Sequence, residues 1–135
     1  MSSQTEAFFQ QYASAFNQGC SKSLAQLFQT PSVIMSDETK AVFSSGQEIT
    51  SAVEALMMKF KQAGISIHLP KISQTIRLSD TIVFVNVLWQ MLDAAEQIVF
   101  SCSSSYTLQQ VDRELKIIVS VNDDGDKALA RLLQD

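Results

Sequence analysis

The apolar residues in the second half of the chain fall into four runs that short polar segments separate. The runs are Ile65–Leu78, Thr81–Met91, Gln97–Leu108 and Leu115–Val121. Apolar runs of this length, with polar breaks between them, indicate consecutive antiparallel strands joined by short turns. We therefore predict a four-stranded meander over residues 65–121.

The first half of the chain has helical periodicity instead. Apolar residues recur at helical spacing up to Gly19, then in a short segment around residues 21–28, and again from about Glu48 to Gly64. The third segment has the most regular apolar stripe. That stripe consists of Ile49, Val53, Leu56, Met57 and Phe60. Three helices are predicted before the meander.

Helices that precede the strands, rather than alternate with them, are typical of the α+β class. We predict one domain over residues 1–135. It is a cone-shaped α+β barrel in which three N-terminal helices pack on one face of a curved antiparallel sheet. A small hairpin is expected at Val33–Met35 and Lys40–Ser44, and a short C-terminal helix after Asp126.

The two faces of the sheet can be assigned because successive side chains of a strand point to opposite sides. If the turn after the second strand of the meander centres on Ala94-Ala95, Val87 pairs with Cys102. The side facing the helices then carries Val85, Val87, Trp89, Cys102, Ser104, Tyr106, Leu115, Ile117, Val119 and Val121. The other side mixes apolar and hydroxyl groups, among them Phe84, Asn86, Leu88, Ser103 and Ser105. Such a surface favours a homodimer through this sheet face.

Composition limits the classes of partner. The net charge is −4, with ten Lys plus Arg that form no basic stripe, so we expect no binding to nucleic acid. No apolar run reaches the ~20 residues of a membrane span. The first residues lack the features of a secretory signal, so a cytoplasmic protein is predicted. Cysteine, histidine and carboxylate side chains show no metal-ligand spacing, and there is no Gly-rich phosphate loop, so we expect neither a metal nor a cofactor.

A local pattern near the N-terminus resembles a known superfamily. Phe9 to Gly19 reads FQQYASAFNQG, and Leu24 to Phe28 reads LAQLF. This pattern is similar to the helix-one and helix-two signature of ketosteroid isomerases: an aromatic residue, two alanines, Asn-x-Gly, then Leu-x-x-Leu-Phe. Gly46 with Ile49 gives a second match. These two matches and the order of elements together make the chain resemble the nuclear transport factor 2-like superfamily. This superfamily has a cystatin-like fold and includes the SnoaL-like polyketide cyclases.

The resemblance implies roles for individual residues. Tyr12 falls where the isomerases place the phenol that donates a hydrogen bond to a developing enolate oxygen. The general base, counted from Tyr12 without gaps, would fall at Ser36, and the adjacent Asp37 is the candidate carboxylate. The second acid of the isomerases falls near Ser104, whose hydroxyl can donate one hydrogen bond. The chain thus departs from the isomerase pattern at two of these three positions.

These residues can also be explained by a role in the fold alone, without any part in catalysis. Tyr12 lies on an apolar stripe and is also expected as a core residue. Asp37 belongs to Ser-Asp-Glu-Thr, a typical turn sequence. His68, the only histidine, alternates with Ile67 and Leu69 and is expected on the opposite face from them, toward solvent or a dimer partner.

We predict a small-molecule-binding protein with an apolar, cone-shaped pocket and without full isomerase machinery. The residues expected to contact a small apolar ligand are Tyr12, Phe16, Met35, Met57, Phe60, Val87, Trp89, Ser104, Tyr106, Val119 and Asp123. Two alternatives stay open. One is an isomerase, cyclase or dehydratase that transfers a proton next to a carbonyl, with Tyr12 as electrophile and Asp37 as base. The other is a non-catalytic dimeric interaction module with a filled core.

Overall fold

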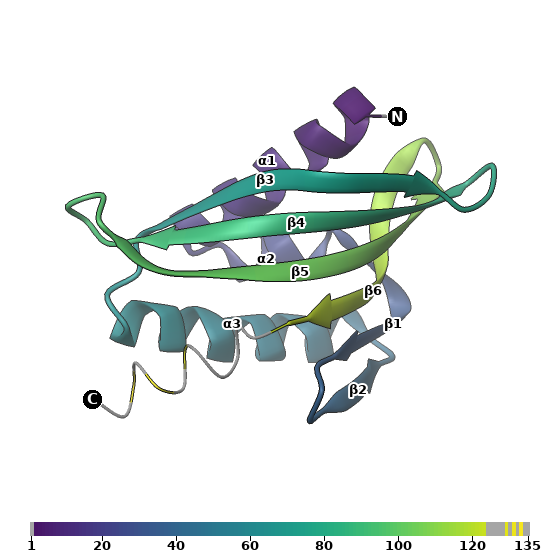
Figure 1. Ribbon diagram of the computed structural model, residues 1–135. Coiled ribbons are helices and arrows are strands. Elements are labelled where there is room, and N and C mark those ends of the chain that lie inside the picture. Colours follow the sequence, from purple (N-terminus) through teal and green to yellow (C-terminus); the bar gives the residue numbers. More distant parts are fainter. Residues whose placement is uncertain (1, 124–128, 130, 132, 134–135) are drawn as a thin grey trace.

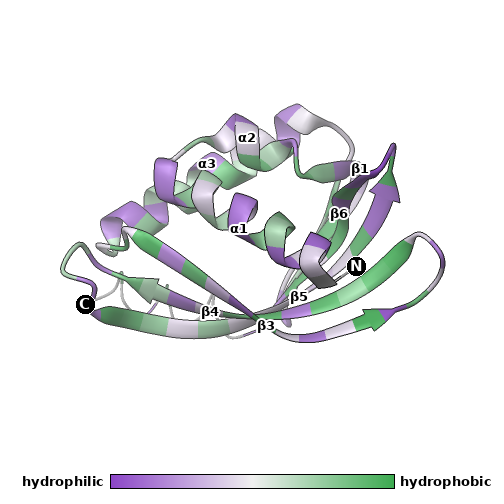
Figure 2. Cartoon of the chain, turned by 90° about the horizontal axis from the view of Figure 1, so that it is seen from above, coloured by the Kyte–Doolittle hydropathy of each residue, from purple (hydrophilic) through white to green (hydrophobic). Residues whose placement is uncertain are grey.

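The computed structural model describes residues 2–123, 129, 131 and 133. The helices are α1 (Ser2–Gln18), α2 (Ser21–Ala25) and α3 (Gly46–Gln62). The strands are β1 (Phe28–Met35), β2 (Lys40–Phe43), β3 (Ile67–Arg77), β4 (Ile82–Leu92), β5 (Ile98–Val111) and β6 (Glu114–Asn122). The helices lie on one side of the sheet, and the sheet curves around them (Figure 1, Figure 2).

The six strands form one sheet in the order β2-β1-β6-β5-β4-β3. The meander strands β3–β6 pair antiparallel, whereas β1 pairs with β6 in parallel. The predicted α+β class, with helices packed on a curved sheet, is confirmed, and the sheet stays unclosed with β2 and β3 at its edges. Of the predicted C-terminal helix, Leu129, Arg131 and Leu133 are helical, and its other residues lie outside the described ones. Within the described residues, no helix has the length and apolar character needed to cross a membrane.

Both long helices end in the same way. Gly19 follows α1 with a φ of 68°, and Gly64 follows α3 with a φ of 78°, a region that glycine enters without steric cost. The N–H of each glycine, and that of the residue after it, donate to carbonyls of the last helical turn, which is the Schellman motif. At the start of α3, the Ser45 hydroxyl oxygen accepts a hydrogen bond from the Glu48 N–H at 3.2 Å. Local sequence therefore fixes where the two helices that cover the sheet stop.

The predicted inward face of β4 and β5 is confirmed. Val87 pairs with Ser104 and Trp89 with Cys102, so each partner lies two residues beyond the predicted one. The displacement has two causes, a longer turn and a β-bulge between Met91 and Leu92. A displacement of two residues keeps the same side chains on the helix side, because the side-chain period of a strand is two.

β6 departs from the predicted parity. Ile117 is fully buried against the helices as expected, but Ile118 is an extra residue in the ladder with β5, a second β-bulge. Beyond this bulge the alternation is reversed, so Ser120 is buried while Val119 and Val121 lie on the outer side. The prediction that Val119 and Val121 face the helices is therefore wrong.

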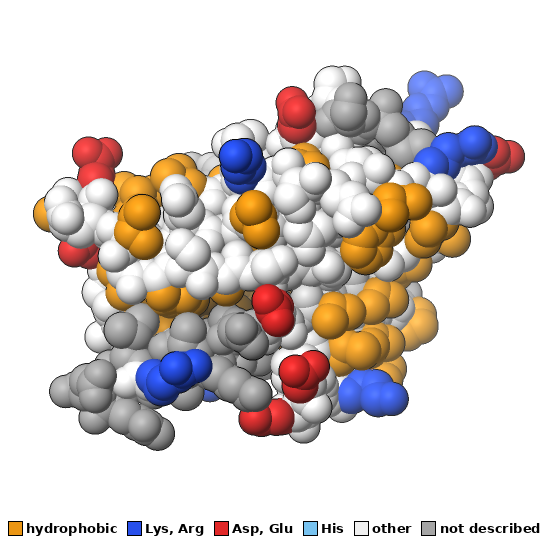
Figure 3. Space-filling model, viewed as in Figure 1, with side chains coloured by type: hydrophobic (Ala, Val, Ile, Leu, Met, Phe, Trp, Pro, Cys, Tyr) orange, Lys and Arg blue, Asp and Glu red, His pale blue; other side chains and the backbone are white. Residues whose placement is uncertain are grey.

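The side of β3–β5 that points away from the helices, called here the outer sheet face, is nearly free of charge. The register places on it Leu69, Lys71, Gln74, Ile76, Phe84, Asn86, Leu88, Gln90, Ser101, Ser103, Ser105 and Thr107. Lys71 is the one charged residue among these. In Figure 3, uncharged polar and apolar side chains cover most of this face. At its centre the Asn86 amide donates hydrogen bonds to the hydroxyls of Ser103 and Ser105, each at 3.0 Å.

The assignment of the inner face can be tested with two leucines. Leu108 of β5 has no exposed surface, whereas Leu78, in the turn after β3, is 57% exposed. We expect Leu108→Ala to lower the free energy of unfolding by about 2–5 kcal/mol, because it leaves a cavity in the core. Leu78→Ala should change it by less than about 0.5 kcal/mol. Urea unfolding gives both values, and similar losses in the two variants would contradict the assignment.

Candidate functional site

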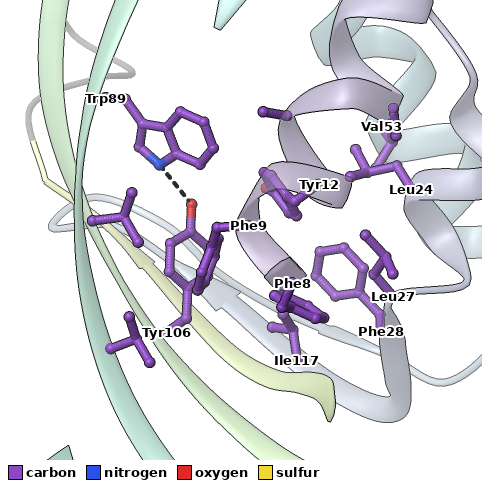
Figure 4. Close-up of a cluster of buried hydrophobic side chains, with 14 of the residues drawn as sticks. Phe8, Phe9, Tyr12, Leu24, Leu27, Phe28, Val53, Trp89, Tyr106 and Ile117 are labelled. Carbon is purple, nitrogen blue, oxygen red and sulfur yellow. Dashed lines mark hydrogen bonds between the residues drawn. The ribbon is translucent and has the colours of Figure 1, made fainter. Parts of the chain in front are cut away.

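A cavity of about 60 Å³ lies inside the cone, between α1, α3 and the inner face of β3–β6. It is lined by Tyr12, Phe16, Leu56, Phe60, His68, Trp89, Met91, Phe100, Cys102, Ser104, Tyr106, Asn122 and Leu129. Aromatic side chains make up much of this wall. Figure 4 shows how Tyr12 from the helical layer and Trp89 and Tyr106 from the sheet point toward one another.

Polar groups gather around the Tyr106 hydroxyl. Trp89 Nε1 donates to this oxygen at 3.0 Å (Figure 4). The side chains of Tyr12 and Ser104 also lie near it. The Ser104 hydroxyl in addition lies 3.3 Å from Asn122 Oδ1 and can donate to it. One chain of uncharged groups thus runs from the indole through the phenol to the Asn122 amide.

The hydroxyl groups of Tyr12 and Tyr106 are both neutral at any physiological pH. Burial raises the pKa of Tyr106 to about 12. The pKa of Tyr12 is raised well above its usual value, first by burial and then by the neighbouring Tyr106.

His68 is the second polar feature of the wall. Its ring packs between Phe16 and Phe60, with centroid distances of 4.9 and 4.8 Å. Its Nδ1 lies 3.1 Å from the Met91 sulfur, a weak hydrogen-bond partner. Its backbone N–H donates to Asn17 Oδ1 at 2.8 Å. Burial lowers the pKa of His68 to about 4, so the imidazole is neutral at pH 7.

Six of the residues expected to contact a ligand do line the cavity. They are Tyr12, Phe16, Phe60, Trp89, Ser104 and Tyr106. They come from α1, α3, β4 and β5, the elements whose periodicity was clearest in the sequence. The helical stripe and the strand parity therefore located this part of the wall.

Five other expected contacts lie elsewhere. Val87 is fully buried in the core but has no surface on the cavity, and Met57 packs against the core and lines a separate groove. Met35 alternates with the inward Ile34 of β1 and pairs with Val121 on the outer side. Val119 is turned outward by the bulge at Ile118. The same bulge leaves Asp123 exposed beyond the end of β6.

Asp37 is not close to the cavity wall. It is exposed in the turn between β1 and β2, where the Ser36 N–H donates to the Thr39 carbonyl at 2.8 Å. The hydroxyl groups of Ser36 and Thr39 are also hydrogen-bonded, at 2.9 Å. No residue of this hairpin lines the cavity. The turn interpretation of Asp37 is correct, and the structure does not bring Asp37 and Tyr12 into one site.

Two polar lining residues were missed by the sequence analysis. His68 was expected to face outward, but it pairs with Met91 of β4, an odd position on the inward side. Aligning the sequences of β3 and β4 as antiparallel partners would have placed His68 opposite Met91 and therefore on the inner face. Asn122 takes the place expected for Asp123, and no sequence pattern reveals a one-residue bulge. The other unexpected lining residues are Leu56, Met91, Phe100, Cys102 and Leu129.

The wall chemistry limits what the site can do. None of the described lining residues is a carboxylate, a lysine or an arginine. Among the residues that the structure describes, no group of three His, Cys, Asp or Glu side chains could hold a metal ion. The site therefore offers neutral hydrogen-bond donors and acceptors in an aromatic setting. Its volume of about 60 Å³ is less than half of the about 150 Å³ of an engineered lysozyme cavity that binds benzene, so a six-membered ring such as benzene or cyclohexanol can enter only if wall side chains move.

The buried imidazole should make stability depend on pH. The folded pKa of His68, about 4, lies below the usual 6.5, so the unfolded chain binds more protons between these values. Its contribution to stability is complete above pH 6.5 and is lost as the pH falls toward 4. Between pH 7 and pH 5 we expect a loss of about 2 kcal/mol in the free energy of unfolding.

The His68→Gln side chain cannot take up a proton. The variant should therefore not show the part of the loss in the free energy of unfolding, between pH 7 and pH 5, that comes from His68. Because His68 is the only histidine, the difference between the two proteins isolates its titration. Urea unfolding at a series of pH values measures it. Parallel pH profiles for the two proteins would contradict a neutral, buried His68.

Comparison with solved structures gives the same fold in several proteins. An NTF-2 like protein of unknown function from Shewanella oneidensis MR-1 superposes with a TM-score of 0.74 at 13% identity, covering 91% of this chain and 98% of that one. A domain of unknown function with a cystatin-like fold from Nostoc punctiforme PCC 73102 gives 0.71 at 15% identity, covering 90% and 75%. A ketosteroid isomerase-like protein from Erwinia carotovora atroseptica SCRI1043 gives 0.66 at 13% identity, covering 90% and 93%.

At these identities the likeness concerns the fold alone. A search of curated protein sequences found no significant match. The sequence profile of one family does match, over residues 3–125, which is most of the chain. This protein therefore belongs to the family described as NTF2-like protein (DUF6841).

Proposed function

We propose that this protein binds a small, uncharged and largely apolar molecule in its cone, without the proton-transfer chemistry of the isomerases. The observation that carries the proposal is the chain of neutral hydrogen-bond groups from Trp89 through Tyr106 and Ser104 to Asn122. Apolar walls with a few convergent polar groups are the usual composition of a small-molecule site. The absence of charged groups from the described wall favours a neutral ligand, because burying a charge without a partner is costly.

Proton transfer next to a carbonyl is less well supported by this geometry. It needs a base whose pKa lies near the working pH, close to the substrate. Asp37 is exposed in a turn, and the pKa of His68, about 4, makes its imidazole a weak base. Burial and the neighbouring Tyr106 raise the pKa of Tyr12 well above its usual value, which makes its hydroxyl a weaker hydrogen-bond donor to an enolate oxygen. Binding without catalysis is therefore the preferred function.

Binding can be tested with cyclohexanol, a neutral ring with one hydroxyl group, and with cyclohexanecarboxylate as its charged counterpart. Trp89 is the only tryptophan and lines the cavity, so its fluorescence reports occupancy. We expect cyclohexanol to change the Trp89 emission and to raise the melting temperature, because a ligand of the folded state stabilises it. The carboxylate should do neither. Equal responses to the two probes would contradict a neutral site.

Two serines of β5 provide a matched pair of variants. Ser104→Ala removes the link between Tyr106 and Asn122, and we expect it to weaken cyclohexanol binding by about 1 kcal/mol, or roughly fivefold. Ser101→Ala makes the same change on the outer sheet face and should leave the affinity unchanged. Loss of affinity in Ser101→Ala alone would place the ligand outside the cone.

A second proposal concerns the outer sheet face, which we infer to be the contact surface of a homodimer. Leu69, Ile76 and Leu88 are 42–43% exposed on it, around the hydrogen-bonded Asn86. A face with little charge does not repel a second copy of itself, and its central amide and hydroxyl groups already satisfy one another. Exposed apolar clusters of this kind mark interaction sites more often than free surface.

The oligomeric state tests this second proposal. Light scattering at micromolar concentration should give about twice the chain mass of 14.9 kDa. Leu88→Lys should produce monomers, because it buries an unpaired charge at the centre of the contact. Leu78→Lys, at the exposed turn after β3, should remain dimeric. A wild-type protein that is monomeric at these concentrations would contradict the proposal.

A further inference from the structure

A second depression lies against the other side of the cavity wall. This outer groove, of about 580 Å³, lies between the end of α1, the middle of α3 and the start of β3. The apolar residues that line it are Phe16, Met57, Met58, Phe60 and Ile65. The polar and charged residues that line it are Asn17, Gln18, Ser21, Glu54, Lys61, Ser66 and His68. The groove has the volume of a typical small-molecule site, which the cavity alone lacks.

Three side chains, called here the aromatic partition, line both spaces. They are Phe16, Phe60 and His68. Their rings contact one another, with centroid distances of 5.7 Å between the two phenylalanines and 4.9 and 4.8 Å from these to the imidazole. The cavity and the outer groove therefore share the aromatic partition as part of the wall of each.

The imidazole is the polar member of this layer. Asn17 fixes the backbone N–H of His68. The ring itself has one polar contact, with the Met91 sulfur, which is a weak acceptor. When this ring turns aside it gives up no strong hydrogen bond, and a neutral imidazole can then donate or accept a hydrogen bond on the other side.

We propose that the cavity and the outer groove are two parts of one binding site, which an elongated neutral amphiphile occupies by displacing the His68 ring. This inference rests on the proposed function and names the class of ligand. The uncharged polar end reaches the groups around Tyr106 and Asn122. The aliphatic chain crosses the partition and lies along Met57 and Met58, whose flexible thioethers adapt to such chains. A ligand of this shape gains the space that the cavity alone does not provide.

Chain length tests the proposal. Cyclohexanol and trans-4-pentylcyclohexanol share the polar ring and differ by one five-carbon chain. We expect the longer alcohol to bind at least tenfold more tightly to the wild-type protein, as buried methylene groups require. Met58 is 63% exposed, so Met58→Lys should fold normally while placing a charge in the groove. It should weaken binding of the longer alcohol at least threefold and leave cyclohexanol unaffected.

Two controls separate the possible outcomes. Val42→Lys makes the same change at a similarly exposed apolar residue of β2, away from both spaces, and should alter neither affinity. If Met58→Lys binds the longer alcohol as tightly as the wild type, the extended site is wrong although the cavity still binds. If the wild type binds neither alcohol, the proposed function itself fails.

The rate of association tests the role of the ring. His68→Ala removes the imidazole from the partition, so the longer alcohol should enter several-fold faster in stopped-flow measurements of Trp89 fluorescence. Leu69→Ala changes the next residue of β3, which is exposed on the outer sheet face, and should leave the rate unchanged. Equal rates in the wild type and His68→Ala would show that the ring is not displaced and would overturn the proposal.

Discussion

The interior of this protein depends on one hydrogen bond, from the Trp89 indole to the Tyr106 hydroxyl. A buried indole N–H or phenol without a partner would cost about 1–3 kcal/mol, so two large aromatic residues can be packed under the helices only if their polar atoms meet. They meet because β4 and β5 pair in a register that places the two residues on the same face, where only the pair Val87 and Ser104 lies between their positions along the ladder. The aromatic core, the position of Tyr12 and the polar end of the cavity all follow from this pair.

The same bond determines what the cavity can offer a ligand. Trp89 donates to the Tyr106 oxygen and the Ser104 hydroxyl can donate to Asn122, so both of these donors are satisfied within the protein. A network of this kind is rigid and electrically neutral, and both properties favour binding over chemistry. The other side of the wall has no strong hydrogen bond of this kind, because the His68 ring is held mainly by ring contacts with Phe16 and Phe60. A hydrogen-bonded group and an aromatic layer thus occupy different parts of the wall of one small space.

Much of this arrangement could be predicted from the sequence, because it follows from periodicity. The helical stripes of α1 and α3 and the strand parity of β4 and β5 gave the fold class, the inner face and about half of the cavity wall. Glycines marked the ends of both long helices correctly. The predictions that failed concern features that periodicity does not encode. The role implied for Asp37 needed a carboxylate in the cone, and the residue instead belongs to a hairpin turn whose own chemistry the sequence already indicated.

The bulge at Ile118 explains the remaining error and has a wider consequence. If β6 paired with β5 without this extra residue in the ladder, Val119, Val121 and Asp123 would face the helices, and a carboxylate would stand where the Asn122 amide now lies. The same string of side chains thus encodes two chemically different interiors, one acidic and one neutral. A single unpaired backbone residue selects the neutral one, so in this protein the polarity of the interior is a property of strand alignment as much as of composition.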